Sequence, residues 1–173
     1  MAGIPAVQPA RDHVRGAVDG GVTLIEYGDF QCPFCGDAYP VVKSLLESFG
    51  WLRFVYRHMP LPDLHPRAPA AAEAAEAAGA QGHFWDMHDR LFENQHALDD
   101  EQLREHAAAL GLDVERFDRE LREGVHTQRV EEDLRSGAQS GIPSTPGFFV
   151  NGAIHLGSAN EPELRRVIEA EFG

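Results

Sequence analysis

Apolar residues follow two different spacings in the first third of the chain. The unbroken apolar run Val22–Ile25 predicts a buried strand over about residues 22–27. Apolar positions then recur at helical spacing, which predicts a helix that ends near Phe49 and is kinked at Pro40. Strand-like alternation returns over residues 51–56, so we expect a strand, a helix and a second strand in that order.

The rest of the chain is helical first and strand-forming later. The pattern is helical throughout from His65 to about Ser140, and Asp99 followed by Gln102 predicts a capping box at one helix start. The pair Asn151-Gly152 between two short apolar runs predicts a tight hairpin. A closing helix is expected over residues 161–172.

This order of elements predicts an α/β fold with a helical insertion. Two strands joined by a helix indicate a right-handed parallel crossover, and the late hairpin would add antiparallel strands to the same sheet. We expect one discontinuous α/β domain formed by residues 12–62 and 141–173. Residues 63–140 would form the inserted helical domain, and residues 1–11 a flexible N-terminal arm.

Composition narrows the classes of partner. A chain of 173 residues with 43% hydrophobic residues can form a core, and a net charge of −13 argues against nucleic acid or an anionic membrane surface as partner. No apolar run approaches the roughly 20 residues of a membrane span. No secretory signal is visible, so a cytoplasmic location is expected, or an extracytoplasmic one if the N-terminus has been trimmed.

Cys32 and Cys35 are the only cysteines, and they lie where the first strand gives way to the helix. Backbone N–H groups and the positive end of the helix dipole at that position favour the reactive thiolate. The pair can be a redox dithiol, half of a zinc site, or inert. A structural zinc site needs four ligands, so two histidines would have to complete it. His83 and His88 have four residues between them, but they share a helical stripe with Phe84 and Trp85 that indicates core or helix surface. The redox interpretation is therefore favoured, with no metal.

Glu26 is a carboxylate inside the apolar strand, six residues before Cys32. Burial of a charge is costly, so a functional role is one interpretation. The other is a glutamate at the edge of the sheet that reaches water or pairs with an arginine.

Three motifs together resemble the DsbA-like branch of the thioredoxin superfamily. They are the run Glu26–Gly36 around the cysteines, the segment Phe84–Phe92, and the segment Gly141–Gly152. The likeness covers about residues 12–172, and similar domains are fused to some bacterial sodium/proton antiporters. It implies a thioredoxin fold, with a mixed central sheet flanked by helices and an all-helical insertion of DsbA type.

The resemblance also implies roles for single residues. Cys32 would be the nucleophile that forms a mixed disulfide with the substrate, and Cys35 would resolve it. The Thr145-Pro146 bond would be cis, and its backbone would pair with an extended substrate segment. Pro33 and Phe34 would also contact the substrate.

Two further residues would tune the chemistry. Glu26 matches a carboxylate position of the family, where it would exchange a proton with Cys35 and have a pKa raised by desolvation. Phe34 stands where strong oxidants of the family often carry a histidine that stabilises the thiolate. We therefore expect a lower reduction potential than in CPHC-type oxidases.

The expected function is a thiol–disulfide oxidoreductase that acts without a bound cofactor on protein or peptide thiols and disulfides, together with an unidentified redox partner. The direction of electron flow stays open, and a monomer or weak dimer is expected. Two alternatives belong to other classes of protein. One is a non-catalytic redox-sensing or regulatory module, and the other is a glutathione-linked transferase or isomerase.

Overall fold

The computed structural model describes residue 4 and residues 6–173, so residues 1–3 and 5 of the predicted N-terminal arm lie outside the described part. The chain divides into two compact units. The first contains residues 1–28, 37–59 and 133–173, and the second contains residues 29–36 and 60–132. Most of the predicted insertion is therefore in the second unit, which also includes the segment with both cysteines.

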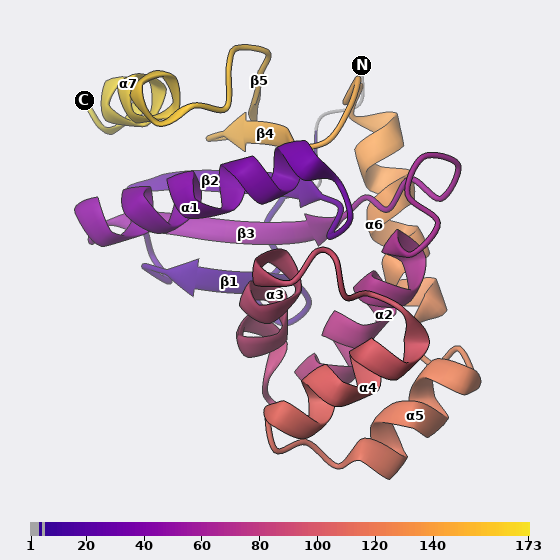
Figure 1. Cartoon of the computed structure of the whole chain (residues 1–173). Helices are drawn as coiled ribbons and strands as arrows, with labels where there is room; N and C mark the ends of the chain where they lie inside the picture. Colours follow the sequence, from indigo (N-terminus) through magenta and orange to yellow (C-terminus); the bar gives the residue numbers. More distant parts are fainter. Residues whose placement is uncertain (1–3, 5) are drawn as a thin grey trace. The chain divides into compact units, whose positions relative to one another are not determined.

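A mixed five-stranded sheet forms the centre of the first unit. Its strands are β1 (His13–Gly16), β2 (Val22–Gly28), β3 (Leu52–His58), β4 (Gly147–Val150) and β5 (Ala153–His155), in the spatial order β1-β3-β2-β4-β5 (Figure 1). Strand β2 is parallel to β3, and the other neighbours are antiparallel. The predicted parallel crossover, the antiparallel hairpin and the α/β class are all confirmed.

The hairpin between β4 and β5 follows from its turn residues. Asn151 and Gly152 both have positive φ angles, 48° and 85°, which this residue pair adopts readily. The turn is also tied to the central strand, because the Asn151 N–H donates to Thr23 O and Asn151 Oδ1 accepts from Thr23 N, both at 2.9 Å. These two hydrogen bonds hold the turn to β2 next to the Leu24–Val150 end of the β2–β4 ladder.

The N-terminal segment is attached to the sheet through Arg57 on β3. Arg57 donates to both carboxylate oxygens of Asp12 at 2.9 Å, to Tyr27 Oη at 3.0 Å and to Ala6 O at 3.3 Å. Burial alone would lower the pKa of Arg57, but its hydrogen bonds to Asp12 and Tyr27 outweigh burial and raise that pKa. Arg57 is therefore a buried cation with a matched buried anion.

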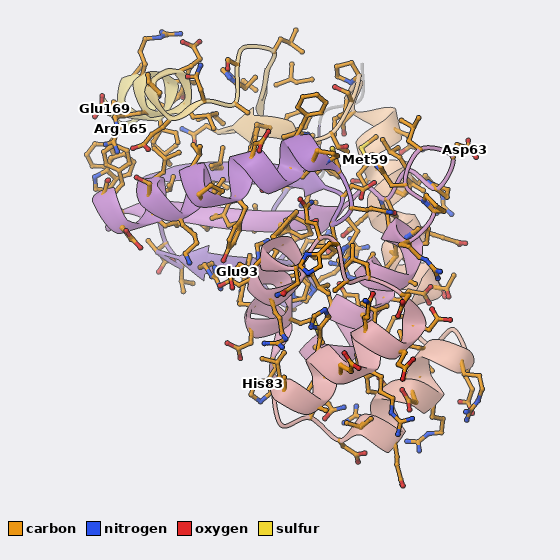
Figure 2. All side chains as sticks on the ribbon, in the orientation of Figure 1. Met59, Asp63, His83, Glu93, Arg165 and Glu169 are labelled. Atoms are coloured by element: carbon orange, nitrogen blue, oxygen red, sulfur yellow. The ribbon has the colours of Figure 1, made fainter. Side chains whose placement is uncertain are left out.

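The C-terminal helix α7 (Glu161–Phe172) is joined to the first unit by stacked aromatic rings. Trp51 stacks on Phe172 with ring centroids 3.8 Å apart, Phe49 stacks on Trp51 at 4.7 Å, and the Arg165 guanidinium lies over Phe49. Figure 2 shows Arg165 and Glu169 on α7. This stack accounts for the aromatic residue at the end of the helix, because stacked rings add to the packing energy.

The second unit is helical. Its helices are α2 (Ala68–Gly79), α3 (Phe84–Glu93), α4 (Asp100–Ala109), α5 (Val114–Arg122) and the start of α6 (Thr127–Gln139). The predicted capping box at Asp99 and Gln102 is present. Buried alanines line α2, which contacts α3, α4 and α5, because small side chains let helices approach closely. Among the described residues no helix is both long and apolar enough to span a membrane.

Candidate active site

Both cysteines lie at the start of helix α1 (Pro33–Ser48), with Cys32 just before its first residue and Cys35 in its first turn. They are not joined by a disulfide bond, and their exposed fractions are 3% and 0%. Phe34 between them is 71% exposed, and Pro33 is exposed as well. The cysteine pair is thus covered, while the two residues that it brackets face solvent.

Asp29 holds the loop before the cysteines through its carboxylate. Asp29 Oδ1 accepts from the backbone N–H groups of Gln31 at 2.8 Å and Cys32 at 3.1 Å. Asp29 Oδ2 accepts from the N–H of Leu61 at 3.0 Å and shares a 2.9 Å hydrogen bond with His65 Nδ1. The side chain is 1% exposed, so this buried charge is compensated by four polar contacts.

Gln95 holds the same loop by donating to backbone carbonyl groups of the loop. It follows two residues after the end of α3, whose last residue, Glu93, is labelled in Figure 2. The Gln95 side-chain amide donates from Nε2 to Phe30 O and to Cys32 O, both at 2.9 Å. Cys32 O also accepts from Gly36 N at 3.1 Å, the first backbone bond of α1.

Aromatic packing completes the support of the loop. The Phe30 ring lies 4.9 Å from that of Phe92 and 5.7 Å edge-on from that of His88, and both partners are buried on α3. These contacts explain why residues 29–36 belong to the helical unit, although the sequence analysis assigned them to the α/β domain. The assignment followed chain order, whereas the loop's side-chain partners come from the insertion.

The other predicted site residues lie in the first unit. Glu26 is 2% exposed on β2, opposite Tyr56 of β3 and Phe148 of β4, so it occupies the central strand rather than an edge of the sheet. Thr145 is buried, and the Thr145-Pro146 bond just before β4 is cis, the isomer that the resemblance implied. The predicted approach of these residues to the cysteines stays a prediction.

Sequence reasoning assigned no role to two residues that hold the site. Asp29 carries a recognisable signal, because an aspartate three residues before a buried helix start often caps backbone N–H groups. Gln95 carries none, since its contacts with Cys32 span 63 residues of sequence. Within the described part of the chain, neither cysteine belongs to a cluster of three or more side chains that could hold a metal ion.

Comparison with known proteins shows the family of this chain. Residues 9–170 match the family model described as Thioredoxin. The chain is 48% identical over 166 residues to the Na(+)/H(+) antiporter NhaA 1 of Salinispora arenicola. This alignment covers 96% of this chain and 26% of that protein. The chain is 46% identical over 167 residues to the antiporter NhaA of Herminiimonas arsenicoxydans, with the same coverage. The chain therefore spans about a quarter of the length of these curated relatives.

Solved structures match over nearly the full length. A thioredoxin-like oxidoreductase from Silicibacter pomeroyi DSS-3 aligns with a TM-score of 0.84 and 28% identity, over 94% of this chain and 92% of that one. BdbD from Bacillus subtilis, in its oxidised form, aligns with a TM-score of 0.83 and 24% identity, over 98% and 96%. The chain belongs to the thioredoxin family, and its fold is that of the DsbA-like thiol–disulfide oxidoreductases.

Proposed function

We propose that this protein exchanges disulfides with protein or peptide substrates through Cys32 and Cys35. One observation carries the proposal: both backbone polar groups of Cys32 are fixed by side chains, Asp29 at its N–H and Gln95 at its C=O, at the start of α1. A thiol held there lies at the positive end of the helix dipole, which favours its thiolate.

In the proposed cycle the Cys32 thiolate attacks one sulfur of a substrate disulfide. A mixed disulfide forms, and the second substrate sulfur leaves as a thiolate that takes up a proton. The Cys35 thiolate then attacks the Cys32 sulfur, which releases the first substrate sulfur and leaves a Cys32–Cys35 disulfide. Two electrons pass from the cysteine pair to the substrate, and oxidation of a substrate dithiol is the reverse sequence.

Glu26, Thr145 and Pro146 have assisting roles in this proposal. Glu26 is a buried carboxylate on the central strand, and it would take the proton of Cys35 as that thiol becomes the attacking group. The backbone around Thr145-Pro146 would pair with an extended substrate segment, while Pro33 and the exposed Phe34 would contact its side chains. In a reducing cytoplasm the pair would act as a reductant.

Catalysed reduction of insulin tests the proposal. The wild-type protein should accelerate insulin precipitation by dithiothreitol, and Cys32→Ser should abolish the acceleration. Cys35→Ser should instead accumulate a mixed disulfide with substrate, because the resolving thiol is missing. A wild-type rate equal to that of Cys32→Ser would reject the enzymatic function.

A second candidate is a redox-sensing regulatory module. It is favoured by the 48% identity with a segment that amounts to 26% of a sodium/proton antiporter. In this hypothesis the cysteine pair switches slowly between dithiol and disulfide and thereby changes the activity of an attached or associated transporter. Slow insulin reduction together with a reversible Cys32–Cys35 disulfide would favour this candidate, whereas rapid turnover would favour the enzyme.

A further inference from the structure

The backbone before the cysteines is held at both ends of successive peptide groups. In the peptide group that joins Phe30 to Gln31, the carbonyl accepts from Gln95 and the N–H donates to Asp29. Cys32 is held on both sides, since its N–H in the preceding peptide group donates to Asp29 and its carbonyl in the following peptide group accepts from Gln95. Rotation of the Phe30–Gln31 peptide group would break two hydrogen bonds together, and rotation of either peptide group next to Cys32 would break one more, so the direction of the Cys32 Cα–Cβ bond is fixed.

Gly36 provides the space that the Gln95 amide occupies. A Cβ atom at Gly36 would lie 2.2 Å from Gln95 Oε1 and 2.8 Å from its Cδ, distances that force the flexible glutamine to move away. Gly36 lies inside α1 without a positive φ angle, so its backbone conformation does not require glycine. The close approach of Gln95 is the local reason for a glycine at this position.

We propose that Gln95 is a positioning residue that sets the reactivity of Cys32 from the helical insertion. This inference rests on the proposed function, in which Cys32 is the attacking thiol. Two donor N–H contacts on the Phe30 and Cys32 carbonyls offset the negative ends of those groups close to the thiolate. Without them the loop can turn and the thiolate loses stabilisation.

The test measures alkylation of Cys32 by iodoacetamide as a function of pH, in a Cys35→Ser background so that one thiol reacts. Gln95→Leu removes the donors at similar volume. It should lower the equilibrium constant for thiolate formation about three- to tenfold, the range expected for one hydrogen bond. The midpoint of the alkylation profile should move to higher pH by the corresponding amount.

Gly36→Ala provides an independent variant that keeps Gln95 but displaces its amide. Alanine favours a helix over glycine, so this variant should keep or gain stability while the alkylation midpoint moves in the same direction. The double variant should have the same midpoint as either single variant, because both changes remove the same contact. If Gln95→Leu does not fold, Gly36→Ala alone decides the question.

Gln81→Leu is the matched control. Gln81 lies in the same unit, is half-buried like Gln95, and also makes two backbone hydrogen bonds, to the N–H and the carbonyl of Asp113. An unchanged midpoint in Gln95→Leu, or an equal shift in Gln81→Leu, would overturn the positioning role. Insulin reduction by the wild-type protein reports separately on the proposed function, since the alkylation profile needs no turnover.

Discussion

The strand Val22–Gly28 and the loop Asp29–Cys32 are adjacent in the chain but are held by different means. Every residue of the strand is buried, and backbone ladders pair it with β3 on one side and β4 on the other. The loop depends on the side chains of Asp29 and Gln95 for its polar contacts and on Phe30 for its packing.

Because of this difference, substitutions that change the stability of the fold should be distinct from those that change the reactivity of Cys32. Many backbone hydrogen bonds hold the strand, so a single substitution around it removes packing or charge but leaves its course unchanged. Few side chains hold the loop, so a single substitution there can redirect Cys32 at small cost in stability. We expect substitutions around the strand to change the free energy of unfolding, and substitutions around the loop to change thiol chemistry.

The largest effect is expected from Arg57→Met on β3. The change leaves the Asp12 carboxylate, whose side chain is 1% exposed, without its bidentate partner. Breaking a buried pair in this way costs about 3–5 kcal/mol of the free energy of unfolding, measured by urea denaturation. Cys32 alkylation in the folded variant should stay at the wild-type midpoint, and a shifted midpoint would show that the loop depends on the packing around the strand.

Arg53→Met on the same strand is the control for Arg57→Met. Arg53 is half-buried, and it donates to Thr23 Oγ1 at 2.9 Å and to Val18 O at 3.2 Å rather than to a buried anion. Its loss should cost about 1 kcal/mol, the range of an ordinary hydrogen bond. Equal destabilisation by both variants would show that the Asp12 charge is not the cause.

The second effect is expected from Asp29→Asn in the loop. The substitution keeps an oxygen for the Gln31 and Cys32 N–H groups but removes a negative charge next to the thiolate. The thiol pKa of Cys32 should fall by about one unit, and the reduction potential should become less negative. Alkylation profiles and glutathione equilibration measure the two quantities.

Asp63→Asn is the matched control for Asp29→Asn. Asp63 is an exposed carboxylate of the same helical unit and is labelled in Figure 2. Its charge is screened by solvent, so its removal should leave the Cys32 pKa unchanged. A raised pKa in Asp29→Asn would mean that Asp29 acts by positioning the loop more than by its charge.

The same contrast explains which features could be predicted from sequence. The Asp99 capping box and the Asn151-Gly152 turn are local, so the residues that form them are a few positions apart. The parallel crossover and the antiparallel hairpin could be predicted in the same way, whereas the order of the five strands was not predicted. Strand β1 was not predicted as a strand, because it has four residues and no apolar alternation, and its pairing with β3 is long-range.

The candidate site divides in the same way. Cys32, Cys35 and the cis bond at Pro146 are marked by short motifs, and the structure has these features where the sequence placed them. Gln95 is one of several glutamines in a helical region, and only the folded chain brings its amide to the Cys32 carbonyl. Reactive residues are therefore easier to identify from sequence patterns than the residues that position them.

A smaller effect on reactivity is expected from Phe34→His. Phe34 is 71% exposed, so the substitution disturbs no packing, and the free energy of unfolding should change by less than about 0.5 kcal/mol. A histidine at this position adds a partial positive charge next to the thiolate. The Cys32 pKa should fall by about half a unit, and the reduction potential should rise toward that of CPHC-type oxidases. An unchanged potential would show that Phe34 does not set the direction of electron flow.

The smallest effect is expected from acid titration of Glu120 on α5, in the helical unit but outside the loop. Burial alone would raise the pKa of Glu120, but hydrogen bonds from His126 and Arg116, both at 2.7 Å, outweigh burial and lower it. A lowered pKa means that this group stabilises the fold above the unfolded value of about 4.3 and loses its contribution as the pH falls through the folded value. Glu120→Gln should therefore cost a few tenths of a kcal/mol at neutral pH, and its deficit in the free energy of unfolding relative to wild type should shrink in acid.

The control is Glu123→Gln, at an exposed glutamate, which should show no such convergence with wild type in acid. If Glu120→Gln also shifted the Cys32 alkylation midpoint, the loop would be sensitive to the stability of the whole helical unit rather than to its own contacts.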